Sequence, residues 1–318
     1  MKKQKLFFYS SVFFLCSFLI IAYFFTPRAV TDPKAVAMAS EKNKAVEKEQ
    51  AAKKAAALQA KQAKEQTNYY EKVTKTITQA AASFQGTVGI TYLDLTTGKQ
   101  ISFNGQQGFY SASTIKVPLA MLLADTLGND AASWSQLVTY NQANDYEEGT
   151  GIIINNIQPA YSLRMLEDYA LTYSDNIAKN MLYDFLGGAA QAKKALYQRY
   201  LNKLPNVEDA QFTSEDAITI LKTLYTKKAT NSEYQRIYHY LKQTVFHERM
   251  DTPLTTGKVA HKIGSYAAFI HDMGIFETPH PFALAVFTKG PDNATSIQFI
   301  ATLTDQLWQL QSNSSPQS

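Results

Sequence analysis

The sequence predicts an α+β domain in which strands from both ends of the domain complete one antiparallel sheet. Segments 88–95 and 100–103 read as a hairpin around the turn Thr96-Thr97-Gly98-Lys99. Three further strand-like segments follow near the C-terminus, over residues 258–264, 268–277 and 282–289. The middle of the chain, from about 114 to 245, shows the spacing of amphipathic helices. Because these helices are inserted between two groups of strands, we expect a single sheet covered by helices.

The predicted domain covers residues 68–310. It opens with a helical stripe of apolar residues that ends near Phe84, and it closes with a helix over about residues 296–310. The remaining residues, 311–318, are polar and are predicted to be disordered. No internal repeat is present in the sequence.

An apolar run occupies residues 6–25, which is long enough to cross a bilayer as a helix. The three cations Lys2, Lys3 and Lys5 precede it, so residues 1–5 are expected to be cytoplasmic and the rest of the chain extracytoplasmic. A cleaved signal peptide is the alternative, although the run does not end in the small residues that a cleavage site prefers. We therefore predict a single-pass protein of the cell membrane with an uncleaved signal-anchor.

Residues 26–67 are rich in Ala, Lys, Glu and Gln, which favour helices, and they contain few larger apolar side chains. This segment is predicted to be a solvated stalk, helical or partly disordered, since it cannot build a core. The formal net charge of the chain is +4. The N-terminal segment contributes more positive charge than this total, through Lys2, Lys3, Lys5 and the stalk. The domain itself is therefore net negative, which disfavours nucleic-acid binding.

Cysteine and histidine usage argues against a metal site or a disulfide. Cys16 is the only cysteine, so no disulfide can form within one chain. The 5 histidines show no spacing typical of metal ligands. We expect neither a metal nor another cofactor.

The segment Ser113-Thr114-Ile115-Lys116 has the form S-x-x-K. Pro118 lacks an N–H and fits the first turn of a helix, which places the helix start near Ser113. Ser113 and Lys116 then lie on one helical face, where their side chains can touch. A buried lysine has a lowered pKa, and its neutral amine could take the serine proton. This motif alone is weak, because a serine and a lysine at this spacing are common.

Two more motifs follow in order. Ser174-Asp175-Asn176 lies between two predicted helices, where Ser or Asp could equally be a helix N-cap. His261-Lys262-Ile263-Gly264 lies on a predicted strand and is a near match to K-T-G, with an edge-strand surface lysine as the ordinary alternative. S-x-x-K, S-D-N and K-T-G in this order form the active-site set of serine enzymes that open β-lactams through an acyl-enzyme.

On these motifs, and on the wider string Phe109-Tyr-Ser-Ala-Ser-Thr-Ile-Lys-Val-Pro, the chain resembles the class A β-lactamase and penicillin-binding serine hydrolase family. The resemblance covers about residues 68–310 and implies the β-lactamase/DD-peptidase-like fold, with an all-helical lobe inserted beside the sheet. It implies a catalytic role for Ser113, Lys116 and Ser174, of which Ser174 relays a proton to the leaving nitrogen.

The resemblance also implies substrate-binding residues. Asn176 would bind the amide chain of the substrate, and Asp175 would turn inward to hold its loop. Lys262 would steer a carboxylate, Gly264 would let the substrate backbone approach the strand, and the N–H of Ser265 would join that of Ser113 as an oxyanion donor. Ile263 departs from the family's Thr or Ser, whose hydroxyl binds that carboxylate.

A second departure concerns hydrolysis of the acyl-enzyme. Class A β-lactamases use a Glu in an E-x-x-L-N loop, whereas the candidate segment here, Gln198-Arg-Tyr-Leu-Asn202, has Gln and reads as a continuing helix. Glu208 and Glu215 lie nearby without the motif. We therefore expect a serine hydrolase that acylates with β-lactams or peptidoglycan stem peptides and deacylates slowly.

Two other readings remain. The first is a catalytically weak module that binds the cell envelope through the same cleft, which Ile263 and the absent Glu favour. The second is a stalked coiled-coil scaffold, which would explain the stalk but not the three motifs.

Overall fold

The computed structural model describes residues 32–204 and 211–314. The chain divides into two compact units, Met1–Gln66 and Thr67–Ser318. Helix α2 (Pro33–Ser83) supplies the described part of the first unit, where the side chains described are exposed. The predicted signal-anchor at 6–25 lies outside the described residues. Within residues 32–204 and 211–314, no helix is long and apolar enough to cross a membrane.

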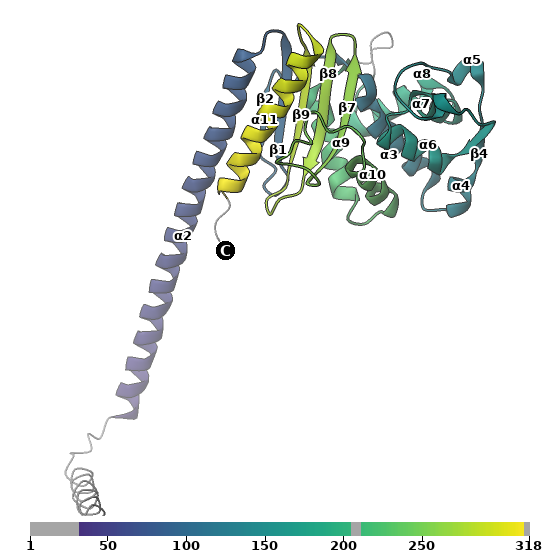
Figure 1. Cartoon of the computed structure of the whole chain (residues 1–318). Coiled ribbons are helices and arrows are strands. Elements are labelled where there is room, and N and C mark those ends of the chain that lie inside the picture. Colours follow the sequence, from purple (N-terminus) through teal and green to yellow (C-terminus); the bar gives the residue numbers. More distant parts are fainter. Residues whose placement is uncertain (1–31, 205–210, 315–318) are drawn as a thin grey trace, which may run out of the picture. The chain divides into compact units, whose positions relative to one another are not determined.

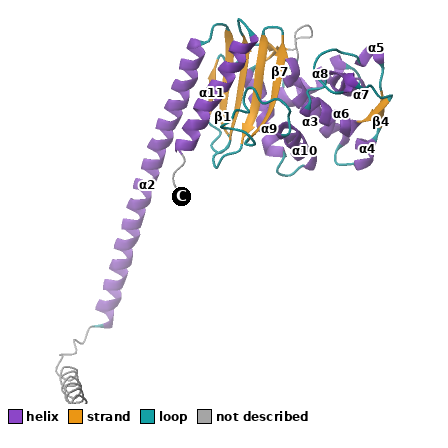
Figure 2. Ribbon diagram, viewed as in Figure 1, coloured by secondary structure: helices purple, strands orange, loops and turns teal. Residues whose placement is uncertain are grey.

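The second unit is built around a five-stranded antiparallel sheet in the order β2-β1-β9-β8-β7. Figure 2 shows its strands with helices on both faces. The strands are β1 (Thr87–Asp94), β2 (Gln100–Phe103), β7 (Val259–Tyr266), β8 (Phe269–Phe276) and β9 (Phe282–Lys289). The pairing of β1 with β9 joins the two ends of the domain, as the sequence predicted. Strand β7 lies at one edge of the sheet.

Successive side chains along each strand point to opposite faces of the sheet. On β9, Phe282, Leu284 and Val286 pack with the C-terminal turns of α2 and with α11 (Asn293–Ser314). The intervening Ala283, Ala285 and Phe287 face the other way and join the larger core. Burial of both faces explains why this strand is apolar from Phe282 to Phe287.

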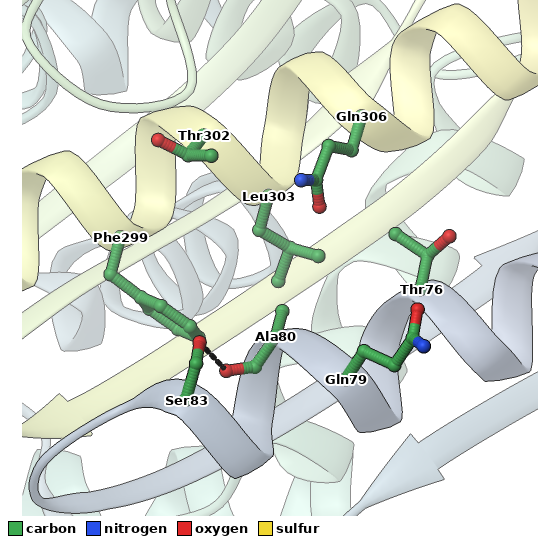
Figure 3. Close-up of a pocket in the computed structure, with 8 residues that line it drawn as sticks. All are labelled: Thr76, Gln79, Ala80, Ser83, Phe299, Thr302, Leu303 and Gln306. Carbon is green, nitrogen blue, oxygen red and sulfur yellow. Dashed lines mark hydrogen bonds between the residues drawn. The ribbon is translucent and has the colours of Figure 1, made fainter.

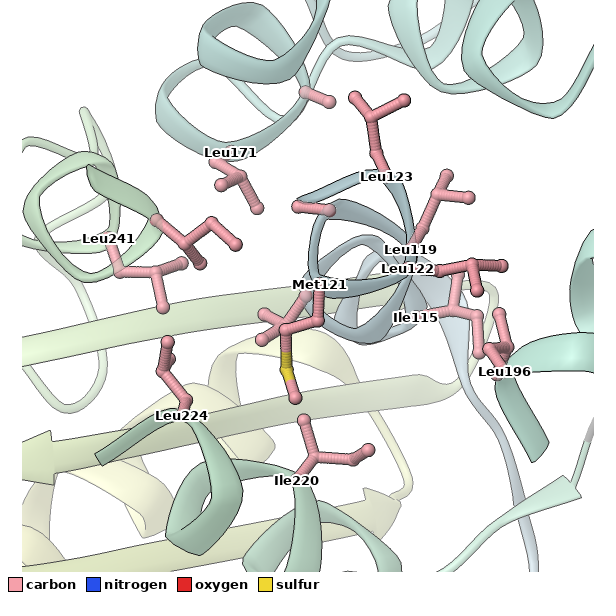
Figure 4. Packing of buried hydrophobic residues seen from close by; sticks show 14 of the residues in the cluster. Ile115, Leu119, Met121, Leu122, Leu123, Leu171, Leu196, Ile220, Leu224 and Leu241 are labelled. Atoms are coloured by element: carbon pink, nitrogen blue, oxygen red, sulfur yellow. The ribbon is translucent and has the colours of Figure 1, made fainter. Parts of the chain in front are cut away.

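The larger core lies between the sheet and the inserted helices, which Figure 1 shows beside β7. Helix α3 (Lys116–Leu127) runs through it, and Figure 4 shows Leu119, Met121 and Leu123 pointing in different directions into their neighbours. The other helices are α4 (Ala131–Ser135), α5 (Gln142–Asp145), α6 (Leu163–Thr172), α7 (Asn176–Phe185), α8 (Ala189–Leu196), α9 (Ser214–Lys227) and α10 (Ser232–Lys242). Two-stranded pairs also occur, β3 (Phe109–Tyr110) with β6 (Gln211–Phe212) and β4 (Leu137–Thr139) with β5 (Ala160–Ser162). The predicted helical lobe is thereby confirmed.

The C-terminus differs from the expectation. Helix α11 continues to Ser314, so the prediction of disorder from residue 311 is wrong for residues 311–314. Gln311 is buried, and its side chain bonds the hydroxyl of Tyr69 and the carbonyl of His280. The side-chain amide of Gln311 can therefore be buried within the helix, because two partners on other elements satisfy its hydrogen bonds.

A shallow cavity of about 280 Å³ lies between the end of α2 and α11 (Figure 3). Phe299 and Leu303 form its apolar part, and Thr76, Gln79 and Gln306 its polar rim. None of the motif residues lines this cavity.

A buried charge cluster ties the helical lobe together. The guanidinium of Arg164 pairs with Glu167 (2.8 Å) and Glu233 (2.6 Å) and lies 3.6 Å from the ring centre of Trp134. The Glu167 carboxyl is completely buried, and desolvation raises its pKa to about 8 against the opposing effect of Arg164. The folded protein therefore binds a proton at Glu167 that the unfolded chain has released.

This cluster predicts that the free energy of unfolding decreases as pH rises. Between the unfolded pKa near 4.5 and the folded pKa near 8, the native state holds the extra proton, so rising pH lowers the free energy of unfolding by about 1.4 kcal/mol per unit. Glu167→Gln should flatten this slope in urea unfolding at pH 5, 6.5 and 8, whereas Asp168→Asn, its neighbour, should keep it. Equal slopes for Glu167→Gln and the wild type would contradict the assignment.

Candidate active site

The predicted nucleophile lies on a 3-10 turn, η1 (Ala112–Ile115), that leads into α3. Ala112 has a φ of 45°, a left-handed conformation that is costly for a residue with a Cβ. Ser113 follows it and is half-buried, with its Oγ 3.0 Å from Nζ of Lys116. Pro118 lies in the first turn of α3, as predicted. The turn therefore presents the hydroxyl of Ser113 to solvent on one side and to the amine on the other.

Lys116 is 1% exposed and is surrounded by oxygen atoms. Its Nζ lies 2.6 Å from the carbonyl of Ser174, 2.9 Å from Oδ1 of Asn176 and 3.3 Å from Oγ of Ser174. Burial, followed by the charge of Lys262, lowers the pKa of Lys116 well below its ordinary value. A neutral amine has one lone pair, and the Ser113 hydroxyl is placed to donate to it. The pair can therefore act as base and nucleophile.

The Ser174-Asp175-Asn176 loop connects α6 and α7. Asp175 is the N-cap of α7, where its side chain accepts from the N–H of Ala178 (2.9 Å). Its other oxygen accepts from the N–H groups of Ile152 (2.7 Å) and Ile153 (2.8 Å). Asp175 thus holds the loop from inside, as predicted. Ser174 has a φ of 53°, and this turn aims its side chain at the two lysines.

Lys262 reaches Ser174 from the strand side. It is fully buried on β7, and its Nζ donates to Oγ of Ser174 at 2.9 Å. Burial lowers the pKa of Lys262 to about 7, while the carboxylate of Asp272 acts in the opposite direction. The hydroxyl of Ser174 therefore lies between two lysine amines, and it is placed to pass a proton between Lys116 and a bound substrate.

Gly264 packs closely against the turn that carries Ser113. A Cβ at this position would lie 3.1 Å from Cγ2 of Thr114, 3.2 Å from the carbonyl of Ser111 and 3.3 Å from Cβ of Ala112. The glycine therefore makes room for η1, and its predicted role in admitting the substrate backbone stays a prediction. Its physical role is to let the edge strand β7 approach the turn that carries the nucleophile.

Arg249 is a site residue that the sequence did not reveal. It is 2% exposed, and its guanidinium donates to the carbonyls of Gly264 (3.0 Å) and His271 (2.7 Å) and to Oγ of Ser265 (2.6 Å). It therefore fixes the end of β7 where Ser265 lies. Arg249 comes from the loop before β7 and belongs to no motif, so no sequence signal identified it.

Ile263 lies on β7 and is buried, so this position of the strand offers an apolar side chain and no hydroxyl. Its side chain is 5% exposed, and its register partner on β8 is Asp272. Asp272 is buried and accepts from Nδ1 of His261 (2.9 Å) and from the N–H of Met250 (3.0 Å). This part of β7 thus presents an apolar side chain next to a buried carboxylate.

The predicted deacylation segment holds no carboxylate. Gln198 is exposed on a π-helical turn, η3 (Tyr197–Leu201), that continues α8, so the helical interpretation is confirmed. Glu215 lies at the start of α9, where it bonds Gln106. Glu208 lies outside the described residues. Within the described ranges, no cluster of His, Cys, Asp or Glu could hold a metal ion.

A carboxylate does lie near Lys116, on the loop before η2 (Ile153–Asn155). Oε2 of Glu147 accepts from Nζ of Lys179 (2.8 Å) and Nδ2 of Asn180 (2.9 Å), and its charge acts on the pKa of Lys116. Glu147 belongs to no motif and only the folded structure brings it here.

Comparison with known proteins identifies the family of the chain. The model of the β-lactamase enzyme family, Beta-lactamase2, matches residues 72–311, and the chain belongs to this family. It is similar to β-lactamase ROB-1 of Haemophilus influenzae, with 25% identity over 259 residues that cover 73% of this chain and 80% of that protein. The chain is accordingly a hydrolase of the β-lactamase type.

Solved structures share the fold. The structure of PBP-A matches with a TM-score of 0.66 at 22% identity, over 74% of this chain and 94% of that one. A class A β-lactamase from Mycobacterium abscessus matches with a TM-score of 0.66 at 20% identity, over 74% and 98% of the two chains.

The packing at Gly264 can be tested by substitution. Gly264→Ala should lower the free energy of unfolding by about 1–3 kcal/mol, because the added methyl group overpacks the contact with η1. Adding Thr114→Ser, which removes Cγ2 and keeps the hydroxyl, should recover part of this loss. Urea unfolding of the single and double variants measures both effects, and an unchanged stability of Gly264→Ala would contradict the packing role.

Proposed function

We propose that this protein is an extracytoplasmic serine hydrolase that forms an acyl-enzyme at Ser113 with β-lactams or with peptidoglycan stem peptides. The observation that carries the proposal is the 3.0 Å contact between Oγ of Ser113 and Nζ of the buried Lys116. A serine hydroxyl is a poor nucleophile until a base takes its proton. Lys116 has the lowered pKa that such a base needs.

Acylation follows from the contacts. The neutral amine of Lys116 takes the hydroxyl proton as Oγ of Ser113 attacks the carbonyl carbon. The N–H groups of Ser113 and Ser265 hold the oxyanion of the tetrahedral intermediate. When the C–N bond breaks, the leaving nitrogen takes a proton from Ser174, which regains one from Lys116 at 3.3 Å. The serine proton thus ends on the leaving group.

The substrate would be positioned by the remaining residues. Asn176 binds the amide chain, and Lys262 attracts a carboxylate while it holds Ser174 at 2.9 Å. Ile263 supplies no hydroxyl to that carboxylate, so we expect a weak first encounter. With Gln198 exposed on a helical turn, we also expect the acyl-enzyme to persist.

A second candidate function is a catalytically weak envelope-binding module. Ile263 and the absence of a Glu from the segment around Gln198 favour it, because both would reduce turnover. It differs from the first proposal in one measurable respect, since a binding module would form no covalent bond at Ser113.

We also propose that the apolar run at 6–25 anchors the protein in the cell membrane, with the Ala-rich segment 26–67 as a stalk. This follows from the sequence alone. Lysines of the stalk would lie near anionic lipid or wall polymer.

The nucleophile can be tested with a fluorescent penicillin and mass spectrometry of the adduct. We expect label on Ser113 alone, none on Ser113→Ala, and labelling slowed by several orders of magnitude in Lys116→Ala, because the serine is then unactivated. Ser111→Ala is the matched control and should label normally. An adduct on Ser111 or Ser174 would contradict the assignment.

A kinetic assay separates the two candidate functions. A chromogenic cephalosporin should give a burst of one equivalent followed by slow turnover. A folded protein with no burst would favour the binding module instead.

The anchor makes its own prediction. Protease added to spheroplasts should remove the chain beyond about residue 30 and leave residues 1–5 protected, because the apolar run would keep them inside. A soluble mature form that begins after Phe25 would show a cleaved signal peptide.

A further inference from the structure

The loop that carries Glu147 is fixed against the Ser174-Asp175-Asn176 loop. Oγ1 of Thr150 donates to the carbonyl of Ser174 (2.7 Å), and the N–H of Asn176 donates to the carbonyl of Thr150 (3.0 Å). Nδ2 of Asn176 donates to the carbonyl of Glu148 (3.2 Å), while its Oδ1 accepts from Lys116. The loop therefore has a defined place relative to Lys116 and, through it, to Ser113.

The Glu147 side chain lies among titratable groups from several elements around Ser113. It contacts Lys179 on α7, and its charge acts on Lys116 of α3, Lys193 of α8, Tyr110 of β3 and Tyr183 of α7. The Tyr183 hydroxyl is buried without a hydrogen-bond partner among the residues that the structure describes. The charge of Glu147 thus acts on groups from α3, α7, α8 and β3, and one of these groups, Lys116, contacts Ser113.

The two carboxylate oxygens of Glu147 differ in their hydrogen bonds. Oε2 accepts from both Lys179 and Asn180, whereas Oε1 accepts no hydrogen bond from the described part of the chain. The side chain is 42% exposed, so water reaches it. Burial acts to raise the pKa of Glu147, but Lys179, Asn180 and Lys116 outweigh it and hold that pKa below its ordinary value. The group is therefore ionised at neutral pH.

We propose that Glu147 is the general base that hydrolyses the acyl-enzyme, in place of the glutamate that the segment around Gln198 lacks. This inference rests on the proposed acylation of Ser113. Water gives a proton to Oε1 of Glu147 as its oxygen attacks the ester carbon. The ester C–O bond then breaks, and the proton returns to Oγ of Ser113, with Lys116 as the last relay at 3.0 Å. The acyl group leaves as a carboxylic acid.

The ion pair explains why this hydrolysis should be slow but measurable. General-base efficiency increases with the basicity of the base until its pKa approaches the working pH. Lys179 lowers the pKa of Glu147 and therefore weakens it as a base. Removing Lys179 should shift the acid limb of the deacylation profile to higher pH, because deacylation needs the ionised carboxylate and is lost as pH falls through its pKa.

The experiment measures acylation and deacylation separately with a chromogenic cephalosporin, as the burst and the steady rate. Glu147→Gln keeps an oxygen for Lys179 and Asn180, so it should fold and give the wild-type burst, with deacylation slower by about 10²-fold or more. Glu148→Gln, an exposed neighbour, is the matched control and should behave as the wild type. Lys179→Gln should move the acid limb upward, which a merely structural ion pair would not do.

The outcomes are distinct. Wild-type deacylation in Glu147→Gln, or an equal loss of burst and steady rate, would overturn the role of Glu147 and leave acylation at Ser113 intact. An unshifted acid limb in Lys179→Gln would count against it in the same way. A wild-type protein that shows no burst would overturn the proposed function itself, and this inference with it.

Discussion

The structure of the site depends on the burial of one lysine. Lys116 is removed from water, so its amine must be satisfied by protein oxygens, and Ser174 and Asn176 supply them. Because those atoms belong to a loop that connects α6 and α7, the lysine also fixes that loop against α3. The same burial favours the neutral amine that can activate Ser113. One interaction thus positions the site and sets its chemistry.

A second lysine extends this constraint to the sheet. Lys262 and Lys116 both approach Oγ of Ser174, at 2.9 and 3.3 Å, and two buried cations so close would repel each other. The charge of Lys262 adds to the effect of burial in lowering the pKa of Lys116. The arrangement requires β7 to lie close to η1, and Gly264 makes that approach possible. The sheet, closed by strands from both ends of the chain, therefore holds one wall of the site.

The parts of this arrangement that the sequence predicted are those carried by local patterns. Alternation predicted β1, its turn predicted the hairpin partner β2, helical spacing predicted the lobe, and the family motifs identified Ser113, Lys116, Ser174 and Lys262, which the fold brings together. The packing of Gly264 against η1 could not be predicted, because its neighbours there are distant in sequence. Gln311 was read as part of a disordered tail because its partners, Tyr69 and His280, could not be foreseen. Arg249 and Glu147 were missed because their place depends on tertiary contacts alone.

The two halves of the proposed reaction depend on different parts of the site. The proposed contacts for acylation, among Ser113, Lys116 and Ser174, are 3.0 and 3.3 Å long and partly or fully buried, and they are made by side chains on three different elements. Glu147, a carboxylate whose charge acts on Lys116, is instead on a loop, partly exposed and paired with Lys179. A base held by an ion pair remains ionised but loses proton affinity. Under the proposed mechanism, such a site favours formation of the covalent intermediate over its breakdown. Ile263 acts earlier, at binding, because it supplies no hydroxyl to the carboxylate of the substrate. The proposed weak encounter and slow deacylation thus have separate structural causes, on β7 and on the loop before η2.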